Sequence, residues 1–257
     1  MSRIRNQQFR SKVMSAEQAA ALIADGTNVG FSGFTGSGYP KAVPQALAAR
    51  ARQIQAEGQT FKIGVFTGAS TAPELDGVLA EADAIAWRTP YQSDPVLRRK
   101  INEGVTDYCD IHLGLAGPLT ASGFLGRLDT AVIEVTAVTE DGQLIPSSSL
   151  GNNLLWIETA RQVILEVNHW QSLDLYGMHD VYYQPALPPH RLPIPIVAAG
   201  DRIGQPTLRI DPAKVVAVVL TEAPDRNTPF KPLDAESKLI AGHLLDFLAQ
   251  EVRAGRL

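Results

Sequence analysis

Three things are scarce in this chain of 257 residues: cysteine, long apolar runs and excess positive charge. Cys109 stands alone, so a disulfide framework is excluded and a cytosolic compartment fits. No apolar stretch reaches the roughly 18 residues that a membrane span needs. The net charge is −4 and the basic residues are scattered, which is not the charge pattern of a nucleic-acid-binding protein. We therefore expect a cytoplasmic protein that binds neither membranes nor nucleic acid.

What the chain does have is the composition of a globular domain, with 45% apolar and 19% charged residues. Periodicity and turn signals predict strands at 27–31, 61–67, 84–87, 110–115, 130–138, 144–147, 162–167 and 215–221. Helices are predicted at 15–25, 41–57, 73–82, 95–103, 153–160 and 234–254. The Asp-Gly pair at 141–142 indicates a hairpin, and the other strands alternate with helices.

This alternation predicts a three-layer α/β fold, with a mostly parallel sheet flanked by helices. We expect one domain over residues 1–257. The range 175–209 is rich in proline and is predicted to be an extended excursion without regular structure.

A glycine-rich segment lies between the strand at 27–31 and the helix that starts near Pro40, with four glycines in nine positions: Gly30, Gly33, Gly36 and Gly38. Such a turn lets the backbone approach a ligand and leaves N–H groups free to bind it, or it simply packs. The pattern is neither a dinucleotide fingerprint nor a P-loop, because Gly38 is followed by Tyr39-Pro40-Lys41. Ser32 is one residue out of register for a nucleophile elbow. A loop that lines a small-molecule pocket remains.

Several ordered motifs carry a family resemblance. They are Ser2-Arg3-Ile4-Arg5-Asn6, Lys12-Val13-Met14-Ser15-Ala16-Glu17-Gln18-Ala19-Ala20, Gly33-Phe34-Thr35, Lys41-Ala42-Val43-Pro44, Phe66-Thr67-Gly68-Ala69-Ser70, Gly123-Phe124-Leu125-Gly126, Pro146-Ser147-Ser148-Ser149-Leu150-Gly151-Asn152-Asn153 and Pro224-Asp225-Arg226-Asn227. With them the chain resembles the amino-terminal half of the acetyl-CoA hydrolase/CoA-transferase family, and in particular its succinyl-CoA:acetate CoA-transferases. The resemblance covers essentially the whole chain.

The resemblance implies that the complete enzyme moves coenzyme A between small carboxylic acids. In that family a glutamate attacks the acyl-CoA thioester, and a glutamyl-CoA thioester follows. The position of that glutamate is expected beyond Leu257, in a carboxy-terminal catalytic domain that this chain lacks, so no catalytic residue is assigned here and the isolated chain is expected to be inactive. The coenzyme A thioester is a substrate, and no permanently bound cofactor is expected. Glu134, in an apolar strand, is either a pocket carboxylate or a paired structural one.

The resemblance also implies which residues bind. For the small carboxylate they are Gly33, Phe34, Thr35, Gly36, Ser37 and Gly38, with Ser148, Gly151 and Asn152 as a second group. Helix capping by Asn152 or Asn153 is the alternative for the second group. For coenzyme A they are Arg226 and Asn227, and the alternative for Arg226 is a surface ion pair with Asp225 or Glu222. The histidines show no metal-ligand spacing, so no metal is expected, and His112 is expected on a strand, in the core or near the pocket. The three tryptophans are expected to pack in the core.

The expected partners are an acyl-CoA, a small carboxylate and the missing carboxy-terminal domain. An exposed apolar patch near the glycine loop, formed by Phe34, Tyr39, Phe124 and Leu125, would also favour a homodimer. Two other functions remain open: an acyl-CoA hydrolase, in which water resolves the intermediate, and a non-catalytic module that binds acyl-CoA or carboxylate.

Overall fold

The structure, a computed structural model, describes residues 3–183, 189–227 and 229–257. The chain forms two compact units, one ending at Asn227 and the other starting at Thr228.

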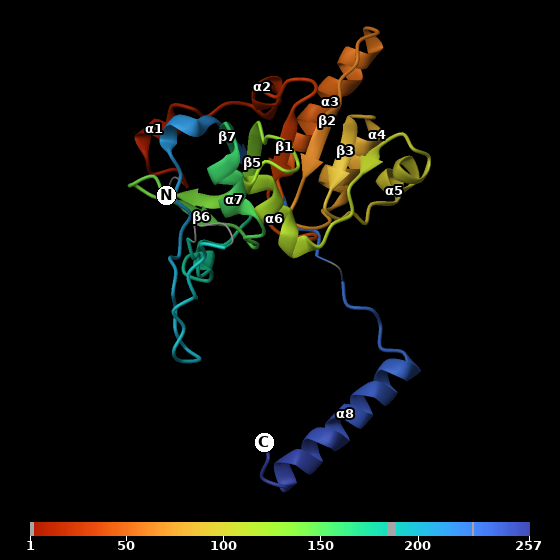
Figure 1. Cartoon of the computed structure of the whole chain (residues 1–257), viewed down its shortest axis with the longest axis vertical. Coiled ribbons are helices and arrows are strands. Elements are labelled where there is room, and N and C mark those ends of the chain that lie inside the picture. The colour runs from red at the N-terminus through yellow and green to blue at the C-terminus, as the bar shows by residue number, and fades with distance from the viewer. Residues whose placement is uncertain (1–2, 184–188, 228) are drawn as a thin grey trace. The chain divides into compact units, whose positions relative to one another are not determined.

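The first unit is built on one eight-stranded sheet with the order β4-β3-β2-β1-β5-β7-β8, and β6 pairs with β5 (Figure 1). Its strands are β1 (Asn28–Phe31), β2 (Ile63–Phe66), β3 (Ile85–Thr89), β4 (Asp107–Tyr108), β5 (Thr130–Val138), β6 (Leu144–Pro146), β7 (Gln162–Asn168) and β8 (Val215–Thr221). Every pairing in the sheet is parallel except that of β6 with β5. The mostly parallel sheet and its hairpin are therefore confirmed.

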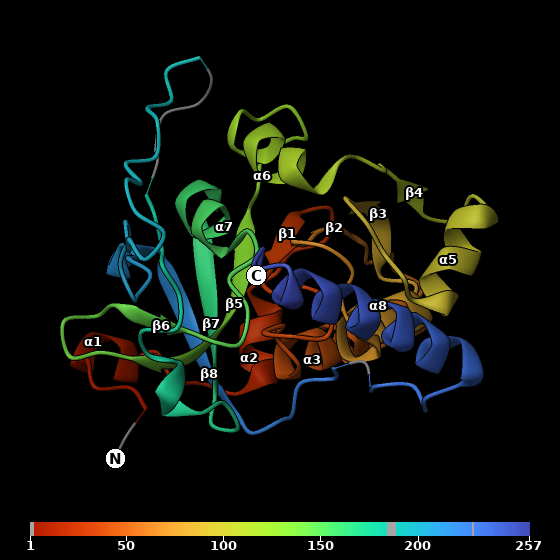
Figure 2. The ribbon, with the colours of Figure 1, turned by 90° about the horizontal axis from the view of Figure 1, so that it is seen from below.

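Helices cover both faces of this sheet (Figure 2). The helices of the first unit are α1 (Gln7–Arg10), α2 (Ala16–Ala21), α3 (Ala42–Ala56), α4 (Val78–Glu81), α5 (Pro95–Asn102), α6 (Leu113–Ala121) and α7 (Asn153–Thr159). A π-helical turn at Pro73–Gly77 precedes α4, and short 3₁₀ turns lie at Leu173–Leu175 and Pro212–Lys214.

Two apolar cores lie on opposite faces of the sheet. One contains residues of α2, α3 and α5, and the other contains residues of α1 and α7. On β5, Val132 belongs to the first core, whereas its neighbours Ala131 and Ile133 belong to the second. Alternation with period two is what a strand buried on both faces requires. The three-layer α/β fold is confirmed.

The strand predicted at 110–115 is wrong. Here α6 begins at Leu113, and the His112 side chain accepts a hydrogen bond from the Gly114 N–H at the start of the helix. The alternation of Ile111, Leu113 and Leu115 imitates a strand, but Leu113 and Leu115 are exposed and have no sheet to face. His112 is also exposed, so its expected place on a strand in the core is wrong as well.

The range 175–209 has isolated bridges, such as Val181 with Gln205, where the structure describes it. Residues 184–188 of that range lie outside the described part of the chain. The second unit contains α8 (Ala235–Arg253), whose first turn is capped by the Asp234 carboxylate, 2.7 Å from the Ser237 N–H. None of the helices in the described ranges is long and apolar enough to cross a membrane.

Candidate functional site

The side of the sheet on which the chain adds successive strands switches between β1 and β5. From β1 the chain adds β2, β3 and β4 outward on one side, and from β5 it adds β7 and β8 on the other. Ligands of open α/β sheets bind at the carboxyl ends of the strands beside such a switch point. The loop Gly33–Gly38 follows the carboxyl end of β1, so the sequence-predicted loop lies at the position that topology favours.

The glycine loop (residues 33–38) is a tight turn with two reciprocal hydrogen bonds. The Phe34 N–H donates to the Ser37 carbonyl at 3.0 Å, and the Ser37 N–H donates to the Phe34 carbonyl at 3.3 Å. Thr35 sits at the tip, exposed and with a left-handed φ of 56°. Within the described part of the chain, the amides of Thr35 and Gly36 have no acceptor. The loop therefore offers two N–H groups and one hydroxyl to a ligand.

Two other glycines pack against the first residue of this loop. A Cβ at Gly68, after β2, would lie 2.8 Å from the Gly33 carbonyl oxygen, and one at Gly151, before α7, would lie 3.2 Å from it. The predicted residues Gly33 and Gly151 thus come together, with Gly68 as a third member that the site prediction missed. Asn152 precedes α7 but its side chain caps no N–H, and neither polar atom of the buried Asn153 side chain has a partner in the described residues. The capping alternative is therefore wrong.

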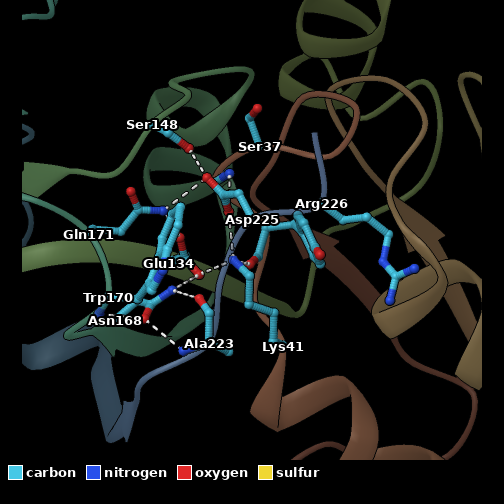
Figure 3. Close-up of polar contacts among 12 residues, drawn as sticks. Ser37, Lys41, Glu134, Ser148, Asn168, Trp170, Gln171, Ala223, Asp225 and Arg226 are labelled. Atoms are coloured by element: carbon cyan, nitrogen blue, oxygen red, sulfur yellow. Dashed lines mark hydrogen bonds and ion pairs between the residues drawn. The ribbon is translucent and has the colours of Figure 1, made fainter. Parts of the chain in front are cut away.

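A buried charge cluster lies behind the loop (Figure 3). The Lys41 ammonium is 2.6 Å from a Glu134 oxygen and 2.8 Å from Asp225 Oδ1, with all three side chains almost fully buried. Asn168 and Gln171 donate to the two oxygens of Glu134 at 3.1 and 3.0 Å. Of the two interpretations of Glu134, the paired carboxylate is confirmed.

The surroundings shift the pKa values of Glu134 and Asp225 in opposite directions. Burial raises the pKa of Glu134 to about 7, and the neighbouring Lys41 opposes this shift. Burial also opposes ionisation of Asp225, but hydrogen bonds from Lys41 and Ser148 outweigh it and lower the pKa of that carboxyl group. Asp225 is therefore the firmly ionised partner of Lys41.

Glu166 on β7 is the register partner of Glu134 on β5, but its carboxylate binds backbone N–H groups and not the Lys41 ammonium. Its carboxylate accepts from the N–H groups of Lys41, Ala42 and Val43 at 2.6, 2.9 and 3.0 Å. These are the N–H groups at the start of α3, which has no cap from its own side chains. Burial raises the pKa of Glu166 although the three N–H groups favour its charged form.

Arg226 and Asn227, the predicted coenzyme A residues, lie against the glycine loop. The Arg226 N–H donates to the Gly36 carbonyl at 3.0 Å, and the Ser37 hydroxyl donates to the Asn227 side-chain oxygen at 2.8 Å. The exposed Arg226 guanidinium pairs with Glu74, 2.8 Å from Nε. The surface ion pair is therefore present, but the expected partners Asp225 and Glu222 are wrong.

The predicted apolar patch does not form. Tyr39 is fully buried, and its hydroxyl donates to Glu74 at 3.1 Å. Phe124 is 78% exposed, but its segment lies near Asn28 at the amino end of β1, whereas Phe34 lies beyond the carboxyl end. Phe34 and Phe124 therefore cannot form one patch, because their segments lie at opposite ends of β1. The homodimer stays a prediction.

The tryptophans differ in burial. Trp156 is fully buried, but Trp170 is 48% exposed, so the expectation of three core tryptophans is wrong for Trp170. Across the described ranges, no three histidine, cysteine, aspartate or glutamate side chains gather as metal ligands.

Sequence reasoning missed Lys41, Asp225 and Glu166 as members of this site. One signal was available: Glu134 and Glu166 each interrupt the apolar run of a buried strand. Buried carboxylates need partners, so two of them in adjacent strands indicate a buried cation or a helix start nearby. The identity of those partners depends on the fold.

The fold is that of an α/β domain with polar loops at the switch point of its sheet. A family model, the acetyl-CoA hydrolase/transferase N-terminal domain, matches residues 1–220, so the chain belongs to that family. The sequence resemblance is confirmed.

Curated relatives include both transferases and hydrolases. The chain is 41% identical to the succinyl-CoA:acetate CoA-transferase of Clostridium kluyveri, covering 99% of this chain and 47% of that protein. It is 39% identical to the propanoyl-CoA:succinate CoA transferase of Escherichia coli, covering 95% and 49%. It is 38% identical to the acetyl-CoA hydrolase of Schizosaccharomyces pombe, covering 100% and 50%. The chain thus spans about half the length of the curated relatives it matches.

Solved structures agree on the fold. RipA from Yersinia pestis superimposes with a TM-score of 0.61 at 20% identity, over 89% of this chain and 46% of that one. The acyl-CoA transferase YdiF from Escherichia coli O157:H7 gives 0.59 at 14% identity, over 91% and 54%. At these identities the likeness concerns the fold alone.

Proposed function

We propose that this chain forms the amino-terminal half of an enzyme that transfers coenzyme A between small carboxylic acids of the acetate and succinate type. The observation that carries the proposal is a family match to N-terminal domains together with a glycine loop at the switch point of the sheet. The nucleophilic glutamate would come from the region that follows this one in the relatives. Acyl-CoA and a small carboxylate are the proposed substrates, and the cytoplasm is the proposed location.

This half would supply one wall of the acyl site. Each acyl transfer passes through a tetrahedral oxyanion, which N–H donors stabilise. The unpaired amides of Thr35 and Gly36 are the available donors of the glycine loop, and the Thr35 hydroxyl lies beside them. Arg226 would meet a phosphate of coenzyme A from its exposed position at the edge of the loop.

Hydrolysis of acyl-CoA is the second candidate, because relatives named acetyl-CoA hydrolases match at 36–38% identity. The two transferases match at 41% and 39% identity, so we propose coenzyme A transfer as the first candidate. The reactions differ in what resolves the glutamyl intermediate: a second carboxylate in one case and water in the other.

The proposal is tested by reconstitution. The purified chain is mixed with the second half of the Clostridium kluyveri relative, and acetyl-CoA formed from succinyl-CoA and acetate is measured. We expect no turnover by either half and acetate-dependent transfer by the pair, since removing a covalent nucleophile costs orders of magnitude in rate. Release of free coenzyme A without need for acetate would instead favour the hydrolase. Robust transfer by this chain alone, or a stable pair of halves without either reaction, would contradict the proposal.

A further inference from the structure

A four-residue segment after β8, Pro224–Asn227, lies across the glycine loop, and we call it the strap. Three hydrogen bonds join the two: from the Arg226 N–H to Gly36, from the Ser37 hydroxyl to Asn227, and from the Gly38 N–H to Asp225 at 3.2 Å. A Cβ at Gly36 would overlap the carbonyl oxygen of Arg226. The backbones of loop and strap are therefore in direct contact.

Asp225 is the buried anchor of the strap (Figure 3). Its Oδ1 accepts from Lys41 and Gly38, and its Oδ2 accepts from Gln171 at 3.0 Å and from the Ser148 hydroxyl. These donors come from three segments of the first unit: Gly38 and Lys41 from the connection between β1 and α3, Ser148 from the segment before α7, and Gln171 from the segment after β7. A carboxylate with this many partners is costly to release from its place, because a buried charge must stay paired.

Lys41 supplies the positive charge for this anchor. Lys41 is 2% exposed as a whole residue. Its ammonium pairs with two carboxylates, Glu134 and Asp225, and also donates to the Tyr39 carbonyl at 2.8 Å. Glu166 is the third carboxylate near Lys41, but it is taken up by the start of α3. Without the ammonium, Glu134 and Asp225 would share one buried site with no cation, and the exposed strap is the part that can leave.

We propose that Lys41 is a positioning residue: through Asp225 it holds the strap on the glycine loop and thereby sets the loop conformation that faces the ligand. The identity of that ligand, a small carboxylate or acyl group, rests on the proposed function. The positioning itself concerns only contacts within this chain, and it can be measured without any activity.

Hydrogen exchange of the hydrogen-bonded loop amides, those of Phe34, Ser37 and Gly38, tests the proposal in the full chain. In Lys41→Met we expect this exchange to rise about tenfold or more, because the strap opens. Lys12→Met is the matched control. The Lys12 ammonium also donates two hydrogen bonds of 2.7 Å, but to the backbone carbonyls of Pro212 and Val215. That control should leave loop exchange unchanged.

A charge-specific rescue separates positioning from simple packing. Adding Glu134→Gln to Lys41→Met removes one of the two unpaired carboxylates, so loop exchange should return to within about threefold of the parent chain. Loss of packing by the lysine stem would not be repaired by that change. If Lys41→Met does not fold, Asp225→Asn keeps the shape of the anchor while removing its charge, and it should raise loop exchange by itself.

The outcomes are distinct. Loop exchange in Lys41→Met or Asp225→Asn that matches Lys12→Met overturns the proposal, and so does a double variant that is no better than Lys41→Met. In the reconstituted pair, Lys41→Met should raise the KM for acetate more than it lowers kcat, because the loop is displaced rather than the nucleophile. If exchange changes as expected but the pair shows no transfer, the proposed function fails and the positioning role stands.

Discussion

Glu134 places an ionisable group in the middle of a parallel sheet, and its pKa makes stability depend on pH. In an unfolded chain this carboxyl group titrates near 4.5, whereas burial raises its pKa to about 7 in the folded protein. Between these values the folded state binds more protons, so the free energy of unfolding falls as pH rises. The shift corresponds to a change on the order of 3 kcal/mol at most.

We therefore predict that Glu134→Gln flattens the decline in unfolding free energy between pH 5 and 8. Urea unfolding at four pH values in that range measures it. Asp225 does not interfere, because its pKa is lowered and its contribution is lost only in more acidic solution. Glu158→Gln is the control, since the raised pKa of that carboxyl group belongs to a partly exposed side chain and its effect should be smaller. An unchanged slope in Glu134→Gln would contradict the account.

At the scale of elements, α3 starts at the site, and its first N–H groups are capped by a side chain of strand β7. Glu166 on β7 accepts hydrogen bonds from three N–H groups at the start of α3. In contrast, α2 is capped locally by Ser15 and Gln18 in a capping box. The two helices thus offer a matched pair of caps, one buried and distant in sequence, the other exposed and local.

Removal of the two caps should have unequal costs. Ser15→Ala should cost about 1 kcal/mol of stability, the usual value for an exposed cap. Glu166→Ala should cost at least about 3 kcal/mol, because it leaves several buried N–H groups without an acceptor and removes a charge from a helix start. Glu166→Gln, which keeps one carbonyl acceptor, should lie between them. Urea unfolding of the three variants decides the order, and equal costs for Ser15→Ala and Glu166→Ala would contradict this role.

Elements with a strong local signal were predictable from sequence. The strand at 215–221 and the helix after Asn152 depend on apolar runs and turn residues, and the structure has them within a residue or two. The segment at 110–115 was not, because its alternating apolar residues face solvent as part of α6. Local pattern carries no information on whether a sheet neighbour exists.

At the scale of the whole molecule, topology turns scattered residues into one site. Lys41 lies 93 positions from Glu134 and 184 from Asp225, so no local pattern links them. The glycine loop was predictable because its glycines are contiguous, and the family resemblance pointed to 148–152 and 226–227. The charge cluster behind the loop depends on which strands are neighbours, and only the sheet order β1-β5-β7-β8 brings its members together.

The central claim is that the glycine loop lines the acyl site, and Thr35 gives the most direct test. Its side chain is exposed at the tip of the loop, so Thr35→Phe adds bulk without disturbing the buried cluster. Phe124→Ala is the control, because Phe124 is exposed near the amino end of β1, away from the loop. The measurement is kcat/KM for acetate in the reconstituted pair. We predict a fall of about tenfold or more for Thr35→Phe and no change for Phe124→Ala, since misplacing a substrate at the reacting centre is costly. An active pair in which Thr35→Phe leaves kcat/KM unchanged would contradict the claim.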